Sequence, residues 1–334
     1  MTPPPSAADL LASAHVVALP MRVRFRGVDV REAVVFEGPC GWGEFAPFPE
    51  YPDDEAARWL AAGSEAAYAG WPAAVRDVVP VNATVPAVPA DRVADVLARF
   101  DGCTTAKVKV AERGQGTDDD VDRVAAVRDV MGADARIRVD ANGGWDESSA
   151  AEALARLAAY DLEYAEQPCA TVEELARLRK TLARNGIDVL IAADESIRKA
   201  EDPVRVARLG AADLVVVKVA PLGGVEAALE VVEACGLPAV VSSALDTSIG
   251  IAAGVALAAA LPQLDHACGL GTVSLFERDV ARDALRPTAG RLVMTRPVPD
   301  PVALEELAAP PARQQWWRDR LSRCAELLAA GSAR

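Results

Sequence analysis

The stretch Ala106-Lys107-Val108-Lys109-Val110 places two lysines, two positions apart, inside a short apolar run. In a β-strand, side chains two positions apart project from the same face. A strand of a parallel sheet is buried on both faces and is normally apolar along its length. Two ammonium groups on such a face are costly unless anions lie opposite them. On this stretch alone, an edge strand protected by lysines remains an alternative.

Three acidic residues and a third lysine follow at nearly even spacing, each at the end of an apolar run. They are Asp140, Glu166, Asp194 and Lys218, separated by 26, 28 and 24 residues. One strand and one helix of a (β/α)8 barrel, with their loops, take roughly 25–30 residues, because eight such units make about 250. A polar residue at the same point of successive units therefore lies on one rim of the barrel.

The chain alternates between strand-like and helix-like patterns from residue 106 onward, which predicts parallel strands joined by helices. An apolar helix is expected over residues 249–261, and an irregular eighth unit near residues 268–276. A doubly wound open sheet is the competing architecture. We favour the closed barrel, because functional residues end several consecutive strands, whereas open sheets gather ligands at one switch point. The expected strands cover residues 106–110, 135–140, 162–166, 189–193, 214–218 and 239–243.

The two ends of the chain lack this alternation. Strand patterns over residues 16–43, followed by an Ala-rich helix over residues 53–76, indicate an α+β module. After about residue 280 prolines recur, and a final helix is expected near residues 314–328. We therefore expect an N-terminal α+β capping domain (1–98, with 1–10 loose), a (β/α)8-type modified TIM barrel carrying the active site (99–285), and a C-terminal segment that packs back on the capping domain (286–334).

Bulk composition narrows the class of function. The 334 residues carry a net charge of −14 without a basic block, which argues against nucleic acid or an anionic membrane as partner. No apolar stretch approaches the roughly 20 residues that span a bilayer, and no export signal is evident, so a cytoplasmic location is expected. Two histidines and six scattered cysteines leave little material for a His-based metal site, a zinc site or a disulfide framework.

Each motif has an ordinary explanation when taken alone. The segment Asp140-Ala141-Asn142-Gly143-Gly144-Trp145 has turn composition, and Glu166-Gln167-Pro168 could simply end a strand. Asp194-Glu195-Ser196 could be a strand end with a helix cap. Lys218 is harder to dismiss, because a lysine in a central strand needs a partner. Occurring together, in this order and at barrel spacing, the motifs indicate an enzyme.

This set of motifs resembles the enolase superfamily, in its muconate lactonizing subgroup. The resemblance covers essentially the whole chain and includes Lys218 followed by Gly223-Gly224. More narrowly, residues 42–51, 242–247 and 269–272 are similar to the actinobacterial o-succinylbenzoate synthases. The resemblance implies a Mg²⁺ ion, with Mn²⁺ as a substitute, and a small-molecule carboxylate substrate. The implied metal ligands are Asp140, Glu166 and Asp194.

The resemblance also implies residue roles and a reaction. Lys109 would be the base that removes the α-proton and then the acid that releases water, and Lys218 would stabilise the anion from the opposite side. Lys107 would contact the substrate carboxylate, and the charges of Lys107 and the Mg²⁺ would both lower the pKa of Lys109. The implied reaction is a syn-dehydration of 2-succinyl-6-hydroxy-2,4-cyclohexadiene-1-carboxylate to o-succinylbenzoate in menaquinone synthesis. Supporting or substrate-binding roles fall to Asn142, Glu195, Ser242, Ser243, Gly269, Phe45 and Phe48, although the two phenylalanines could equally pack between domains.

Rival readings keep the fold and change the chemistry. An N-acylamino acid racemase or dipeptide epimerase would use Lys109 and Lys218 as acid and base on opposite faces. Dipeptide epimerases of the superfamily carry Asp-x-Asp after the last strand, where this chain has Gly269-Leu270-Gly271-Thr272. A muconate-type cycloisomerase is a further alternative. A barrel that binds an anion without catalysis is disfavoured, because no lysine or carboxylate of the set is missing.

Overall fold

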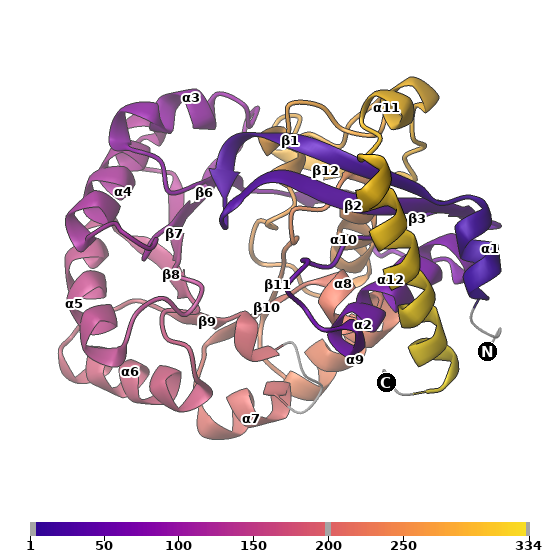
Figure 1. Ribbon diagram of the computed structural model, residues 1–334. Coiled ribbons are helices and arrows are strands. Elements are labelled where there is room, and N and C mark those ends of the chain that lie inside the picture. The colour runs from indigo at the N-terminus through magenta and orange to yellow at the C-terminus, as the bar shows by residue number, and fades with distance from the viewer. Residues whose placement is uncertain (1–4, 198–201, 332–334) are drawn as a thin grey trace.

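A curled parallel sheet ringed by helices forms the larger part of the molecule, and a three-stranded antiparallel sheet lies beside it (Figure 1). The computed structural model describes residues 5–197 and 202–331. The strands of the parallel sheet neighbour one another in chain order. They are β5 (Ala83–Val85), β6 (Thr105–Lys109), β7 (Arg136–Asp140), β8 (Leu162–Glu166), β9 (Ile191–Ala193), β10 (Leu214–Val217) and β11 (Ala239–Val241).

An irregular segment spans the gap between the first and last strands of this sheet. Parallel bridges join Cys268 to Val81 and Gly269 to Ser242. The amide of Gly269 also donates a hydrogen bond to the carbonyl of Val241 (2.8 Å). The barrel-type fold is therefore confirmed over the open-sheet alternative, and the eighth unit is irregular, as expected from the sequence.

Strand β5 was not foreseen, and it shows that the barrel begins before residue 99. It contains three residues, and it pairs in parallel with β6 through Ala83 and Ala106. The proposed division of the chain near residues 98 and 285 remains a prediction. Strand β5 precedes the first of these boundaries, although it pairs with β6 of the barrel sheet.

The barrel helices carry clear end signals. The hydroxyl of Thr171 caps α6 by accepting a hydrogen bond from the amide of Glu174, and the carboxylate of Glu174 accepts one from the amide of Thr171.

None of the helices in the described part of the chain is long and apolar enough to cross a membrane. The helices are α3 (Val93–Leu97), α4 (Thr117–Met131), α5 (Glu147–Leu157), α6 (Val172–Arg184), α7 (Asp202–Leu209), α8 (Val219–Leu222), α9 (Val225–Cys235) and α10 (Ser248–Ala260).

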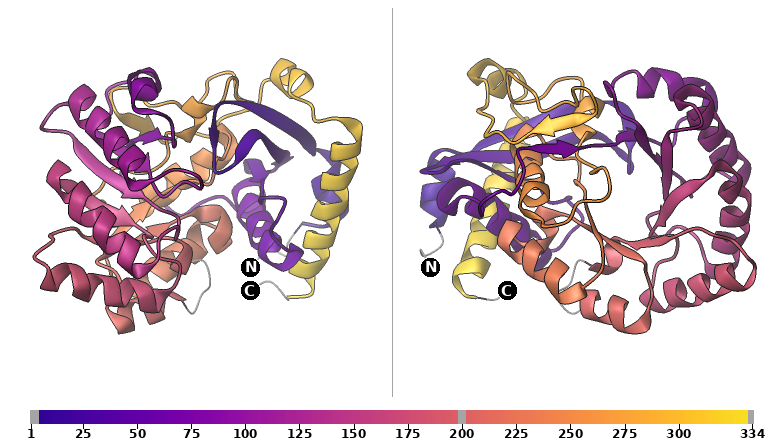
Figure 2. Two further views of the ribbon diagram at one scale, coloured as in Figure 1. Left: turned by 60° about the vertical axis from the view of Figure 1, so that its left-hand side comes forward. Right: turned by 180° about the vertical axis from the view of Figure 1, so that it is seen from behind.

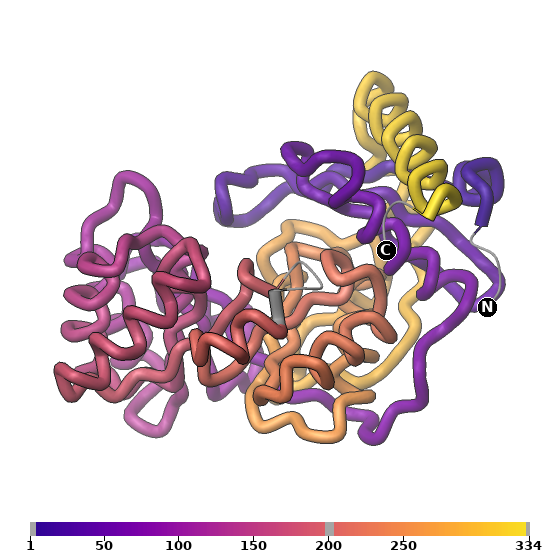
Figure 3. Tube along the Cα trace, turned by 90° about the horizontal axis from the view of Figure 1, so that it is seen from below, coloured from indigo at the N-terminus to yellow at the C-terminus, as the bar shows by residue number. Residues whose placement is uncertain are grey.

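The capping part joins the two ends of the chain. Helix α12 (Pro311–Ala329) packs on α2 (Asp53–Ser64) and lies along the N-terminal sheet, away from the magenta barrel helices (Figures 2 and 3). Trp317 of α12 is fully buried and donates its indole N–H to Glu32 (2.9 Å). The capping strands are β1 (His15–Phe25), β2 (Val28–Gly38) and β3 (Gly41–Phe45); β4 (Val78–Pro80) pairs with β12 (Arg291–Val293), and α11 (Pro301–Glu306) precedes α12.

Two expectations at the N-terminal end need correction. Residues 1–10 were expected to be loose, but Ala7–Ala12 form helix α1, capped by Ser6, while residues 1–4 lie outside the described part. The helix expected over residues 53–76 ends earlier, because α2 continues only as a π-helical stretch to Ala69. Gly70 then adopts φ 85°, a left-handed conformation that ends the helix.

A buried ionic cluster joins the capping sheet to the barrel. Arg31 of β2 donates to the carbonyls of Leu245 (3.1 Å) and Ala244 (3.3 Å) in the loop after β11. Glu44 of β3 accepts from the amide of Thr247 (3.1 Å) in the same loop. Burial, together with the negative charge of Asp246, raises the pKa of Glu44 to about 8. This part of the interface therefore holds two carboxyl groups and one guanidinium.

The raised pKa makes stability depend on pH. The folded protein keeps Glu44 protonated, whereas the unfolded chain ionises it near its ordinary value of 4.5. The contribution of this group is therefore present at acidic pH and is lost as pH rises toward about 8. Glu44→Gln removes the ionisation, so its melting temperature should fall less than that of the wild type between about pH 5 and pH 8.5, by at least about 2 °C.

The control for this measurement is Glu37→Gln, which changes an exposed glutamate on β2. Its melting temperature should follow the wild type at every pH. Parallel curves for Glu44→Gln and the wild type would contradict the assignment of a protonated Glu44 at this interface.

Candidate active site

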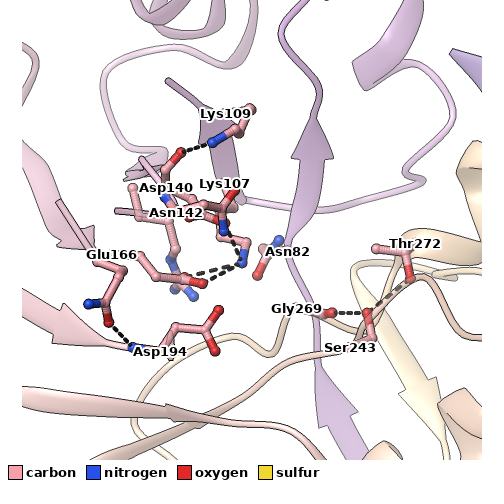
Figure 4. A network of polar contacts seen from close by, with 12 residues as sticks. Asn82, Lys107, Lys109, Asp140, Asn142, Glu166, Asp194, Ser243, Gly269 and Thr272 are labelled. Atoms are coloured by element: carbon pink, nitrogen blue, oxygen red, sulfur yellow. Dashed lines mark hydrogen bonds and ion pairs between the residues drawn. The ribbon is translucent and has the colours of Figure 1, made fainter. Parts of the chain in front are cut away.

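The sequence motifs converge at one end of the parallel sheet (Figure 4). Lys109 pairs with Asp140 across β6 and β7, and Asp140 pairs with Glu166 across β7 and β8. Asp194 follows β9 and Lys218 follows β10. Because paired residues of parallel strands lie at one level, the strand register itself brings these side chains together.

Lys107 lies between two of the carboxylates. Its Nζ is 2.9 Å from Oε1 of Glu166 and 3.3 Å from Oδ2 of Asp140. All three residues are buried. Burial alone would lower the pKa of Lys107, but the charges of Glu166 and Asp140 outweigh it and raise that pKa above its ordinary value. The lysine pair of β6 therefore faces anions inside the barrel, and the edge-strand alternative is wrong.

The two carboxyl groups next to Lys107 shift in opposite directions. Burial, and secondly the charge of Asp140, raise the pKa of Glu166 to about 8. Burial also acts to raise the pKa of Asp140, but Lys107 and Lys109 outweigh it and hold that pKa below its ordinary value. Burial is the main reason for the raised pKa of Glu166, and Lys107 and Lys218 offset it only in part.

Lys109 is a buried lysine with a lowered pKa. Burial lowers its pKa from the ordinary lysine value, and nearby Arg26 adds to this lowering against the opposing effect of Asp140. A lowered pKa was expected from the charges of Lys107 and a bound Mg²⁺, whereas burial is the largest cause in the structure. The ammonium donates one hydrogen bond, to the main-chain carbonyl of Asp140 at 3.4 Å.

Lys218 and Asp194 form an ion pair on the next strands of the barrel. The amide of Asp194 donates to Oε1 of Gln167 (2.9 Å). Gln167 is fully buried and also binds Ser196, accepting from its amide (3.3 Å) and donating to its hydroxyl (2.9 Å). This side chain ties the loop after β8 to the loop after β9. Its function was missed, although it belongs to the Glu166-Gln167-Pro168 motif.

Asn142 and Glu195 occupy supporting positions. The amide of Asn142 donates to Oδ1 of Asp140 (3.0 Å), and its side chain donates to Oε1 of Glu195 (3.2 Å). Asn142 has φ 45°, a conformation that asparagine tolerates better than most residues. Asn142 thus links the carboxylate of Asp140, at the end of β7, to the loop after β9.

A pocket opens over this cluster. The loop after β11 forms one of its walls, which includes Ser242 and Ser243, and Gly269 lies next to them as expected from the sequence. Arg26, at the turn between β1 and β2, is a further lining residue that the sequence did not single out. The pocket is lined by Phe25, Arg26, Thr84, Lys107, Asp140, Asn142, Lys218, residues 242–245, Gly269 and Thr272.

The two candidate phenylalanines are not among these lining residues. Phe45 is fully buried in the capping core, where its ring meets Trp317 edge-on at 5.8 Å. Phe48 is also buried, with the guanidinium of Arg26 above its ring at 4.8 Å and that of Arg31 at 4.4 Å. Of the two alternatives left open for these residues, their burial favours packing: Phe45 packs within the capping part, and Phe48 lies beneath Arg26, which lines the pocket.

Comparisons with known proteins agree with this geometry. Residues 90–299 match the family described as enolase C-terminal domain-like, and residues 16–67 match the one described as enolase N-terminal domain-like. The chain is 59% identical to an o-succinylbenzoate synthase of Mycolicibacterium smegmatis, over 97% of this chain and 98% of that protein. The chain belongs to the o-succinylbenzoate synthase family of the enolase superfamily. The narrower resemblance of the sequence motifs is thereby confirmed, and the chain is an enzyme.

A second relative and two solved structures extend the comparison. The o-succinylbenzoate synthase of Mycobacterium tuberculosis H37Rv is 58% identical over 96% of this chain and 95% of that protein. The muconate lactonizing enzyme of Pseudomonas putida shares the fold with a TM-score of 0.74 and 22% identity, over 89% of this chain and 98% of that one. The N-succinyl Arg/Lys racemase of Bacillus cereus has a TM-score of 0.72 and 19% identity, over 89% and 97%.

The carboxylates of this family member fit a divalent cation by their chemistry. Among the described residues, no three His, Cys, Asp or Glu side chains stand as a metal-binding group, since Lys107 and Lys218 pair with the carboxylates instead. Three buried carboxylates at the ends of neighbouring strands are nevertheless the oxygen ligands that hard cations prefer.

Gly269 offers a test of how the pocket wall is built. A Cβ at this position would lie 2.5 Å from the hydroxyl of Ser242, and the carbonyl of Gly269 accepts from Ser243 (2.7 Å). Gly269→Ala should therefore destabilise the protein by about 1–3 kcal/mol and lower kcat/KM. In the double variant with Ser242→Ala the clashing hydroxyl is gone, so unfolding measurements should show much of the lost stability restored.

Ser242→Ala alone is the control for this pair. If the double variant is no more stable than Gly269→Ala, the close approach of the two segments is not the reason for glycine at this position.

Proposed function

We propose that this enzyme catalyses the dehydration of 2-succinyl-6-hydroxy-2,4-cyclohexadiene-1-carboxylate to o-succinylbenzoate, a step of menaquinone synthesis. The observation that carries the proposal is that the carboxylates of β7, β8 and the loop after β9 lie between two lysines: Lys109 on β6, buried and of lowered pKa, and Lys218 after β10, which is ion-paired with Asp194. The 59% identity to an enzyme named for this product supports the choice of substrate.

Asp140, Glu166 and Asp194 would hold a Mg²⁺ ion, with Mn²⁺ as a substitute. When bound, the ion supplies positive charge that stabilises the anion formed on the substrate carboxylate. Lys107 would then leave its present carboxylate partners and bind the substrate carboxylate. Asn142 and Gln167 would hold the carboxylate-bearing loops in place, through the contacts that they make with Asp140 and Asp194.

Lys109 would perform both proton transfers. A lowered pKa increases the fraction of the amine that is unprotonated near neutral pH, and this form can accept the α-proton. The C–H electron pair moves into the ring, and the C–O bond of the hydroxyl breaks. The same ammonium then protonates the departing oxygen, so that one water leaves and the amine is regenerated. Lys218 would stabilise the anion between these two steps as a cation.

The pocket wall would select the substrate. Ser242, Ser243 and Arg26 line the pocket together with Asp140. A dicarboxylate with a ketone offers acceptors for the guanidinium of Arg26 and the hydroxyl of Ser242. The capping part would therefore contribute Arg26, from the turn after β1, to substrate binding.

The base assignment can be tested with Lys109→Arg. Arginine keeps the positive charge but stays protonated in proteins, so turnover should fall by about 10²–10⁴-fold, as expected for loss of a general base. The measurement is formation of the aromatic acid from the cyclohexadiene substrate with Mg²⁺ present. Lys180→Arg, an exposed position on α6, is the matched control and should keep wild-type turnover.

Full turnover by Lys109→Arg would remove the base assignment. The racemase alternative has its own measurement, deuterium exchange at Cα of N-succinyl amino acids in D₂O. Exchange at a high rate without dehydration would show that the two lysines work as acid and base on opposite faces of a different substrate.

A further inference from the structure

A buried ion pair on α4 holds the main chain at Lys109 and just after it. Asp120 and Arg123 are 2% and 1% exposed, and Oδ1 of Asp120 lies 2.9 Å from Nη1 of Arg123. Neither residue lines the pocket described above. A buried ion pair offers little stability by itself, because both charges lose their hydration. Its position next to the base therefore needs another reason.

Arg123 binds the carbonyl that belongs to Lys109 itself. Nη1 donates to this carbonyl at 2.9 Å, and Nε donates to the carbonyl of Val88 at 2.6 Å. Nη2 donates to the side chain of Gln115, which in turn donates to the carbonyl of Ala87 (3.0 Å). One planar guanidinium thus joins the end of β6 to the loop after β5, which a lysine with a single nitrogen could not do.

Asp120 acts two residues further along the chain. Its Oδ2 accepts from the amide of Ala111 at 3.0 Å. Ala111 has φ 56°, an unfavourable left-handed conformation for alanine, which persists only where its surroundings hold it. Ala111 also lies close to the loop that follows β7. A Cβ added to Gly144 in that loop would lie 2.9 Å from the Cβ of Ala111. The bend that turns the chain away from Lys109 is therefore fixed on both sides.

The side chain of Lys109 has little to fix it apart from its main chain. Among the described residues, its Nζ makes one hydrogen bond, at 3.4 Å to the carbonyl of Asp140. A long side chain held this weakly takes its position from the backbone to which it is attached. Movement of the carbonyl of Lys109 or of the bend at Ala111 would therefore move the nitrogen.

We propose that Asp120 and Arg123 are positioning residues, which clamp the main chain at the carbonyl of Lys109 and at the bend two residues after it, and so align the lysine nitrogen with the substrate α-carbon. This inference rests on the proposed role of Lys109 as the base. Alignment of reacting groups is sensitive to small shifts, and a misplacement of about 1 Å can cost about 100-fold in rate. The contribution of the pair is thus to kcat, whereas substrate binding depends on other residues.

The test compares Arg123→Lys, Asp120→Asn and Asp120→Ala with the wild type. Turnover is measured with ordinary substrate and with substrate deuterated at the α-carbon. We expect kcat to fall by about 10- to 100-fold, with KM changed by less than about 3-fold, and the kinetic isotope effect on kcat to rise, because proton removal becomes slower relative to other steps. Asp120→Asn should keep more activity than Asp120→Ala, since its amide oxygen can still accept from Ala111.

A merely structural role gives a different pattern. Loss of folded enzyme lowers the apparent kcat but leaves KM and the isotope effect of the remaining enzyme unchanged, and this result would overturn the proposal. Asp122→Asn, exposed on the same helix, and Arg156→Lys on α5 are matched controls and should keep wild-type kinetics.

If the buried variants do not fold, Gln115→Ala is a milder change, which removes only one hydrogen-bond acceptor of Arg123. It should show the same rise in the isotope effect, and an unchanged isotope effect would again overturn the proposal.

The outcome for Lys109→Arg separates the two proposals. If it loses turnover while folded clamp variants keep wild-type kcat and isotope effect, the clamp is refuted and the proposed function stands. If Lys109→Arg keeps full turnover, the proposed function fails, and the clamp fails with it.

Discussion

The site depends on the arrangement of charge inside the barrel, where the ammonium of Lys107 lies between the carboxylates of Asp140 and Glu166. None of these groups is stable in isolation away from water, so each constrains the place of the others. The parallel register of β6, β7 and β8 sets their separation, and burial, together with the charge of Asp140, raises the pKa of Glu166 to about 8.

The surroundings of the cluster keep it in this arrangement from three directions. Gln167 holds the loop after β9, the Asp120–Arg123 pair holds the end of β6, and Arg31 with Glu44 holds the loop after β11. The last of these contacts comes from the capping sheet, so the capping part shapes the pocket wall as well as covering the barrel. Loops form much of the pocket wall, and buried charged side chains hold them in place.

The sequence was sufficient to predict the elements that repeat. The strand at residues 162–166 has the predicted bounds, and the lysines and carboxylates of the motifs meet as the barrel spacing requires. Strand β5 was missed, because three residues between prolines carry neither a polar marker nor a readable period. Arg26 and Arg123 were missed for a different reason. An arginine in a turn or on a helix face is common, and only the three-dimensional contacts show that one lines the pocket and the other binds the carbonyl of Lys109.

The central claim is that Asp140, Glu166 and Asp194 form one cation site flanked by lysines. It is tested most directly by diffraction from crystals soaked in Mn²⁺, using the anomalous signal of the metal. The account predicts one strong peak in contact with a carboxylate oxygen from each of the three residues, and its absence in crystals of Glu166→Gln. A peak elsewhere in the barrel, or none at Mn²⁺ concentrations that support turnover, would contradict it.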